Sequence, residues 1–256
     1  MASLLFYKNP TALEKNKHKA LKLRTDIGLD FAKQANSVPL AAVEFFKAGR
    51  NFPIFFIKKA DESYIPVALL SLRKDEHDLD DRFNGYYVPI FIRRYPFALT
   101  DEGLVIVDES SQHLTYDESP QAQDLFDQTD STDKADEGHT KTLSEVIKFL
   151  RTADAAYKST EAFTKALADK NVLKPFATTV SYKSVKVKLD GLYTIDEESL
   201  RGLDDQTALE WFKSNYLAWS YAQMNSVDSL ATLAELQAEA QEAKAVQANA
   251  TQYKQV

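Results

Sequence analysis

Residues 87–97 read Tyr87-Val-Pro-Ile-Phe-Ile-Arg-Arg-Tyr-Pro-Phe97, an apolar run that holds two adjacent arginines and two prolines. Its β-branched and aromatic residues predict a strand. Because Pro89 and Pro96 cannot donate ladder hydrogen bonds, we expect this strand at a sheet edge or between two bends. Side chains alternate along a strand, so Arg94 shares a face with the apolar residues and Arg93 does not. We therefore predict that Arg94 is buried and Arg93 exposed.

The arginine pair admits two interpretations, because guanidinium groups are seldom buried unless they are paired. In one, an arginine clamps a carboxylate or phosphate of a ligand. In the other, it forms an internal ion pair with Asp108 or Glu109. Replacement of the buried arginine by alanine is expected to cost about 3–5 kcal/mol, and of the exposed one under about 1 kcal/mol. The surrounding aromatic residues either line a sugar or peptide site or belong to the core: Phe83, Tyr86, Tyr87, Phe91, Tyr95 and Phe97.

The neighbouring segments predict an α+β fold. Apolar runs at 52–58 and 65–72 flank a charged turn and predict a hairpin. Further strands are expected at 104–107 and at 180–189, the latter as one strand with a bulge near Lys183. Short turns between the early strands favour a mostly antiparallel sheet in the N-terminal half, with helices packed on it. Helices are expected at 37–49 and in the C-terminal region from 227. From 143 onward, two further helices are expected around 143–150 and 163–167, followed by helices at 196–203 and at 208–219, the last with Ala208, Phe212, Tyr216 and Trp219 on one buried face.

The domain organisation predicted from these segments is one α+β domain over residues 1–222 and a helical tail over 223–256. Residues 110–142 are acidic and poor in apolar side chains apart from Leu125 and Phe126. They predict a long loop with one anchoring pair.

Composition excludes several classes of protein. The chain of 256 residues has no cysteine, which excludes disulfides and cysteine metal sites. Its net charge of −7 opposes nucleic-acid binding. Only seven glycines are present and none cluster, so glycine-rich phosphate loops are excluded. No apolar run at the N-terminus or elsewhere has the length of a secretion signal or a membrane span, so a cytoplasmic protein is expected.

Other candidate chemistry has plainer explanations. His77 lies in the acidic stretch 75–81, the one candidate metal cluster, but the spacing fails the calcium-loop pattern, so a solvated turn is favoured. No Gly-x-Ser-x-Gly motif accompanies a serine nucleophile. The acids at 108–109 and 196–198 could serve acid–base catalysis on a sugar. Asp196 is better explained as the N-cap of a helix.

The chain resembles the bacterial SapC family from His18 to about Trp219. Its most specific match is the 87–97 stretch; weaker matches follow in family order. These are Val38-Pro-Leu40 with Glu44-Phe45, Phe52-Pro-Ile-Phe55, Pro66-Val-Ala-Leu-Leu70, Asp108-Glu109, Leu125-Phe-Asp127, and Gly191 with Asp196-Glu197. The chain departs from the family at 75–85, where a tryptophan-containing turn is missing.

The resemblance implies no catalytic residue set. Family members are associated by name with a surface layer, and similar sequences lie near genes for outer-membrane nutrient receptors. We expect a non-catalytic cytoplasmic accessory or regulatory protein that binds a partner protein or a small anionic or carbohydrate ligand and is linked to nutrient uptake. The alternatives are a carboxylate-dependent enzyme on glycans or peptides and a surface-layer protein. No cofactor, metal or nucleic acid is expected, and the candidate ligand-binding residues are Arg93, Arg94, Tyr87, Tyr95, Phe91 and His18.

Overall fold

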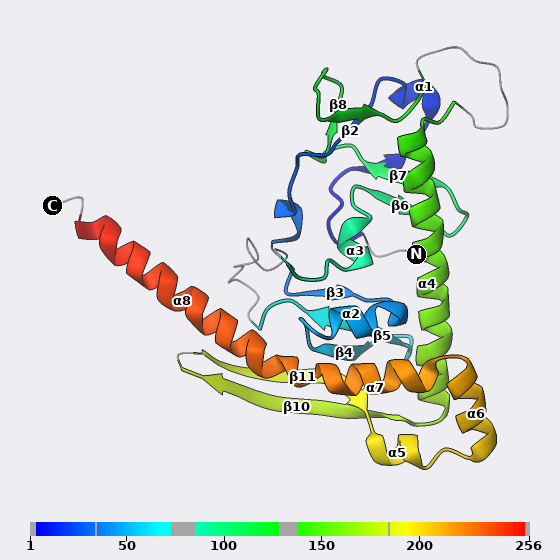
Figure 1. Cartoon of the computed structure of the whole chain (residues 1–256), viewed down its shortest axis with the longest axis vertical. Coiled ribbons are helices and arrows are strands. Elements are labelled where there is room, and N and C mark those ends of the chain that lie inside the picture. Colours follow the sequence, from blue (N-terminus) through cyan, green and yellow to red (C-terminus); the bar gives the residue numbers. More distant parts are fainter. Residues whose placement is uncertain (1–3, 34, 73–84, 128–137, 184, 254–256) are drawn as a thin grey trace. The chain divides into compact units, whose positions relative to one another are not determined.

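The computed structural model describes residues 4–33, 35–72, 85–127, 138–183 and 185–253 (Figure 1). It divides into two compact units: unit 1 comprises Met1–Phe31 and Ile90–Ala155, and unit 2 comprises Ala32–Pro89 and Ala156–Val256. Antiparallel sheets and helices make up both units, which confirms the α+β prediction. The acidic stretch around His77 lies outside the described residues.

Unit 1 contains two three-stranded antiparallel sheets. One has the order β1 (Pro10–Ala12), β7 (Val105–Asp108), β6 (Phe97–Leu99), and the other β8 (Leu114–Thr115), β2 (Lys22–Arg24), β9 (Ala122–Asp124). Strands β8 and β9 lie within the predicted acidic loop. Leu125 and Phe126 are buried there, in a cluster with Leu21, Phe97 and Leu143. The short helices are α1 (Lys15–His18), η1 (Asp30–Ala32) and α3 (Ile90–Arg93).

Unit 2 is built on a five-stranded antiparallel sheet. Its strand order is β10 (Leu173–Tyr182), β11 (Val185–Ile195), β4 (Ile54–Lys58), β5 (Tyr64–Leu69), β3 (Ser37–Pro39). The β4–β5 hairpin is confirmed, with Ile57 opposite Ile65. The single strand predicted at 180–189 is wrong: Lys183, at φ 47°, lies in the turn between β10 and β11. What looked like a bulge is the turn of a hairpin.

The helices of unit 2 also differ in part from the prediction. The helix expected to begin at Ser37 starts later, because Ser37–Pro39 pairs with β5; it consists of η2 (Ala42–Glu44) and α2 (Phe45–Ala48). The helix expected at 208–219 is broken at Asn215, whose φ is 65°, into α6 (Asp205–Lys213) and α7 (Tyr216–Ser226). As a result Phe212, predicted to be core, is 72% exposed, whereas Trp219 is buried.

The remaining helices are α4, α5 and α8. The expected helices around 143–150 and 163–167 are one helix, α4 (Lys141–Asp169). Helix α5 (Glu197–Arg201) begins at Asp196, which accepts a hydrogen bond from the backbone N–H of Ser199, so the N-cap prediction is confirmed. The C-terminal helix is α8 (Ser229–Tyr253), which follows α7 and runs along the β10–β11 hairpin before extending beyond it (Figure 1). None of the helices in the described ranges is long and apolar enough to span a membrane.

Candidate functional site

The arginine segment forms helix α3 rather than the predicted strand. The backbone N–H of Arg94 donates to the carbonyl of Ile90 at 3.0 Å, as in a helical turn. Pro89 precedes the helix, a position where its fixed φ is suited to helix entry and its missing N–H costs nothing. The predicted burial is nevertheless confirmed: Arg94 is 7% exposed, whereas Arg93 lies on the surface.

Arg94 is held by aromatic side chains of unit 1. Its guanidinium lies 4.4 Å from the centroid of the Phe91 ring, within the range of a cation–π interaction. It also forms a hydrogen bond with the Tyr7 hydroxyl, which in turn donates to the carbonyl of Phe97 at 2.6 Å. Burial raises the pKa of Tyr7 despite the neighbouring Arg94 charge, so this phenol stays protonated. Arg93 lies 5.4 Å from the Phe149 ring of α4.

Asp108, at the end of β7, accepts five hydrogen bonds. It is fully buried. Its Oδ1 accepts from the Asn9 N–H at 2.9 Å and from the Ser110 N–H and hydroxyl at 3.1 and 2.7 Å. Its Oδ2 accepts from the Lys8 N–H at 3.1 Å and the Tyr95 hydroxyl at 3.0 Å. Burial acts to raise the pKa of this carboxyl, but the bonds from Ser110, Asn9, Lys8 and Tyr95 outweigh it and the pKa is lowered.

Tyr95 connects Asp108 to a layer of stacked rings. Its ring stacks on Phe31 at a centroid distance of 4.1 Å, and the His113 ring meets both rings edge-on. Phe6 contacts Phe31, Tyr95 and Phe91. Burial raises the pKa of Tyr95 to about 12, so its hydroxyl remains a donor to Asp108. These rings therefore form packed structure around the carboxylate.

His18 contacts the carboxylate of Glu109, the residue that follows Asp108 in the sequence. The ring is fully buried. Its Nδ1 lies 3.0 Å from the backbone nitrogen and 3.1 Å from the carbonyl oxygen of Glu14, and its Nε2 lies 2.9 Å from a carboxylate oxygen of Glu109. Lys17 and then His18 lower the pKa of Glu109 to about 2. His18 and Tyr95 are thus fixed to adjacent carboxylates.

Tyr87 belongs to unit 2, whereas the other five candidates belong to unit 1. Its hydroxyl donates to the buried Glu44 at 2.9 Å, and its backbone N–H donates to the Asn51 side chain at 3.1 Å. The second oxygen of Glu44 accepts from the backbone N–H of Ala41 at 2.8 Å. The structure therefore places Phe91, Arg93, Arg94, Tyr95 and His18 in unit 1 and Tyr87 in unit 2.

Sequence reasoning missed several residues of the unit 1 cluster, among them Tyr7, Asn9, Phe31 and Ser110. Asn9 contributes through its backbone N–H as well as its side chain, which bonds to Glu109 at 3.2 Å. A backbone donor leaves no mark in the sequence. The one sequence feature that pointed to this part of the cluster was the short apolar run Leu4-Leu-Phe-Tyr7.

We predict unequal costs for the two arginines. Arg94→Ala removes the stacking on Phe91 and the bond to Tyr7, and we expect it to destabilise unit 1 by about 2–3 kcal/mol. Arg93→Ala, at the surface, should cost under about 1 kcal/mol. Both tryptophans lie in unit 2, so the measurement is amide hydrogen exchange in β6 and β7. Equal, small changes would show that Arg94 contributes little to the fold.

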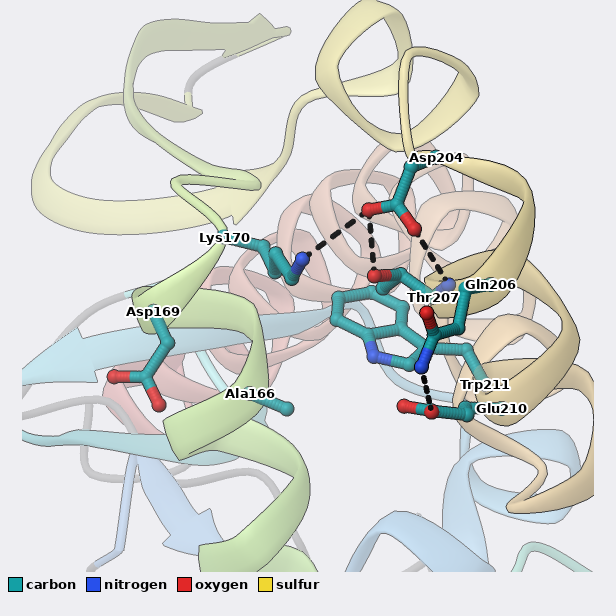
Figure 2. Close-up of a pocket in the computed structure, with 8 residues that line it drawn as sticks. All are labelled: Ala166, Asp169, Lys170, Asp204, Gln206, Thr207, Glu210 and Trp211. Carbon is teal, nitrogen blue, oxygen red and sulfur yellow. Dashed lines mark hydrogen bonds and ion pairs between the residues drawn. The ribbon is translucent and has the colours of Figure 1, made fainter.

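A hollow of about 490 Å³ lies in unit 2 between the end of α4 and helix α6 (Figure 2). Asp204 caps α6 by accepting from the Thr207 N–H at 2.9 Å and hydroxyl at 2.7 Å, and Lys170 reaches it at 3.3 Å. These contacts, the backbone bond first, lower the pKa of Asp204 to about 2. On the same helix the Gln206 amide donates to Glu210 at 3.3 Å. The polar groups of this hollow are used in internal bonds.

The part of the chain that the structure describes contains no group of three or more histidine, aspartate or glutamate side chains that could hold a metal ion.

Comparison with protein families gives a match to the SapC family over residues 13–233. No curated protein and no solved structure matches the chain.

Proposed function

Because the chain belongs to the SapC family, we propose that it is a non-catalytic accessory protein, with the cytoplasm as its expected compartment, that works by binding a partner protein. Membership alone does not give the partner. The support comes from the chemistry of the carboxylates and from the surface of unit 2.

Exposed apolar side chains on neighbouring helices of unit 2 are the observation that carries the proposal. Leu209 and Phe212 lie three residues apart on α6, so they share a face. Val43 and Phe46 are likewise three apart on η2 and α2, and Tyr221 lies on α7, which packs against both α2 and α6. These five side chains are between 48% and 72% exposed. Large exposed apolar side chains on neighbouring elements are typical of protein interaction sites.

The carboxylates favour binding over acid–base catalysis. A general acid that works near neutral pH needs a raised pKa. The pKa values of Asp108, Glu109, Asp196 and Asp204 are all lowered, by hydrogen bonds and cations that tie them to neighbouring chain segments. Such groups stay ionised and hold the fold together. Within this proposal the ligand-facing member of the six candidates is the exposed Arg93, whereas the buried Arg94 and His18 hold unit 1 together.

The test compares three proteins as affinity baits in extracts of the source cells: wild type, Leu209→Ser/Phe212→Ser, and Leu104→Ser. Leu104 is 60% exposed and lies in unit 1, so it is the matched control. We expect one protein to be retained by wild type and control and at least tenfold less by the α6 variant. Titration with that protein in purified form should reproduce the difference.

The proposal is wrong if every retained protein is retained equally by the α6 variant in purified titrations. It is also wrong if the purified chain cleaves a glycan or peptide and the activity is lost on substitution of a carboxylate. Thermal melts of the α6 variant check that its fold is intact, which its exposed positions lead us to expect.

A further inference from the structure

The β10–β11 hairpin of unit 2 has two unlike faces. Its inner face carries Val180, Tyr182, Val185, Val187 and Leu189, which pack with Leu233, Ala234 and Ala238 of α8 in one apolar cluster. The opposite face carries Thr179 and Ser181 on β10, paired across the strands with Lys188 and Lys186 on β11. These four residues are exposed. Helix α8 therefore packs against the apolar face of the hairpin and leaves the polar face exposed.

The hairpin is the basic part of an acidic chain. Strands β10 and β11 and their turn (residues 173–195) contain Lys174, Lys183, Lys186 and Lys188 and one acidic residue, Asp190, although the whole chain has a net charge of −7. Lys188 pairs with Asp190 and Lys183 with Glu242, each at 3.1 Å and each largely exposed to solvent. Such exposed pairs are weak and exchange readily with an incoming carboxylate. Lys186 has no ion pair within the described residues.

Strand β10 is also an open edge. It is the outermost strand of the five and pairs with β11 alone. In the ranges that the structure describes, the backbone of Leu173–Tyr182 makes no hydrogen bond to any other element. Pro175 interrupts this edge near its start, whereas Ala177–Tyr182 contains no proline and can both donate and accept. A ten-residue strand with an unpaired side is a template for a further strand.

We propose that the outer edge of β10 binds an extended, acidic segment of a partner protein as a sixth antiparallel or parallel strand. Backbone hydrogen bonds to β10 would provide affinity, and carboxylates on one face of the added strand would meet the hairpin lysines. The added strand would lie about 10 Å from β11, two strand spacings of ~4.8 Å. A lysine and a glutamate side chain together span that gap. This inference rests on the proposed partner-binding function and names the chemistry of one partner segment.

A peptide fits this surface better than a nucleic acid does. The unpaired backbone edge offers donors and acceptors at the spacing of another β-strand, which a phosphate backbone does not match. The net charge of −7 repels a polyanion as a whole, whereas a short acidic segment meets only the lysines. The open edge of β10 and the exposed lysines lie on the same hairpin, and both favour an extended acidic peptide as the ligand.

The experiment selects ten-residue peptides from a random display library on the full-length protein. We expect enrichment of peptides with aspartate or glutamate at alternate positions, with affinities that fall as salt is added. Lys186→Glu/Lys188→Glu should weaken the selected peptides at least tenfold. Lys47→Glu/Lys213→Glu makes the same change of charge at exposed helix positions of unit 2 and should leave binding within about twofold. Bound peptide should slow hydrogen exchange of amides in Ala177–Tyr182.

Four outcomes overturn the proposal: no acidic enrichment, equal loss in both lysine variants, no added protection in β10, or tighter lysine-dependent binding of a twenty-residue oligothymidylate. Leu209→Ser/Phe212→Ser should bind the selected peptides as wild type does. Its behaviour therefore separates failure of the hairpin site from failure of the α6 surface.

Discussion

Asp108→Ala is expected to destabilise unit 1 by about 3–5 kcal/mol, because it strands several donors in a buried site at once. The two oxygens of Asp108 receive five hydrogen bonds, from Lys8, Asn9, Ser110 and Tyr95. Alanine removes this fully buried acceptor from the backbone N–H groups of Lys8 and Asn9 and from the Tyr95 hydroxyl at once. Amide exchange in β6 and β7 is the measurement, since tryptophan fluorescence reports on unit 2.

The pH dependence of the same site gives an independent check. The pKa of Asp108 is lowered in the folded protein, so its contribution to stability is present above its unfolded pKa of about 3.9 and is lost as the pH falls through the folded pKa. Asp108→Asn presents an amide much as the protonated acid presents a hydroxyl. The stability gap between wild type and Asp108→Asn should therefore be largest near neutral pH and shrink below pH ~4. A gap that does not change with pH would mean that charge contributes nothing there.

The parts of the fold that were predicted correctly are those with local signals. The β4–β5 hairpin has two apolar runs and a charged turn, and Asp196 precedes a helix at the spacing of an N-cap. The errors occur where a non-glycine residue adopts positive φ. Lys183 and Asn215 both do so, and neither marks a turn as glycine would. Because Lys183 was not recognised as a turn residue, the β10–β11 hairpin was predicted as one bulged strand. Because Asn215 was not recognised as a helix break, α6 and α7 were predicted as one helix.

The arginine segment shows how a correct burial pattern can come from the wrong element. Ile90, Phe91 and Ile92 are all buried, a run that suits either a short helix or a strand. Pro89 was assigned as a strand boundary although it equally suits a helix start. Arg94 is the buried member in both cases. Its surroundings were not predictable, because Tyr7 and Phe31 come from distant parts of the sequence and Asn9 acts on Asp108 through its backbone.

In the candidate site, too, the contacts between residues distant in the sequence were not predictable. One of the two interpretations of the arginine pair gave it Asp108 or Glu109 as an internal partner, and the structure shows these carboxylates bonded to Tyr95 and His18. Adjacent residues in the sequence thus organise two sets of contacts, both within unit 1. Four of the six candidates are explained by these contacts or by packing within unit 1, namely His18, Phe91, Arg94 and Tyr95. The surfaces proposed for partner binding, on α6 and on the β10–β11 hairpin, could be identified only once side-chain exposure and strand order were known.

Phe163→Ala in α4 is expected to cost about 3–5 kcal/mol, because it empties the centre of the unit 2 core. Phe163 is fully buried. Its ring lies 6.2 Å from Phe45, 6.5 Å from Phe56, 5.2 Å from Tyr216 and 5.4 Å from Trp219, so four other residues from α2, β4 and α7 border the resulting cavity. Tryptophan fluorescence during urea unfolding is the measurement, since Trp211 and Trp219 are the two tryptophans of the chain.

Phe212→Ala is the matched control for this change. It removes the same atoms from the same unit, but from a side chain that is 72% exposed, so we expect a loss under about 0.5 kcal/mol. The comparison decides between the two assignments of residues 208–219. If a continuous helix buried Phe212 together with Trp219, as the spacing alone suggests, both alanine variants would lose several kcal/mol. Loss confined to Phe163→Ala means that the break at Asn215 turns Phe212 outward, which leaves it available for a partner.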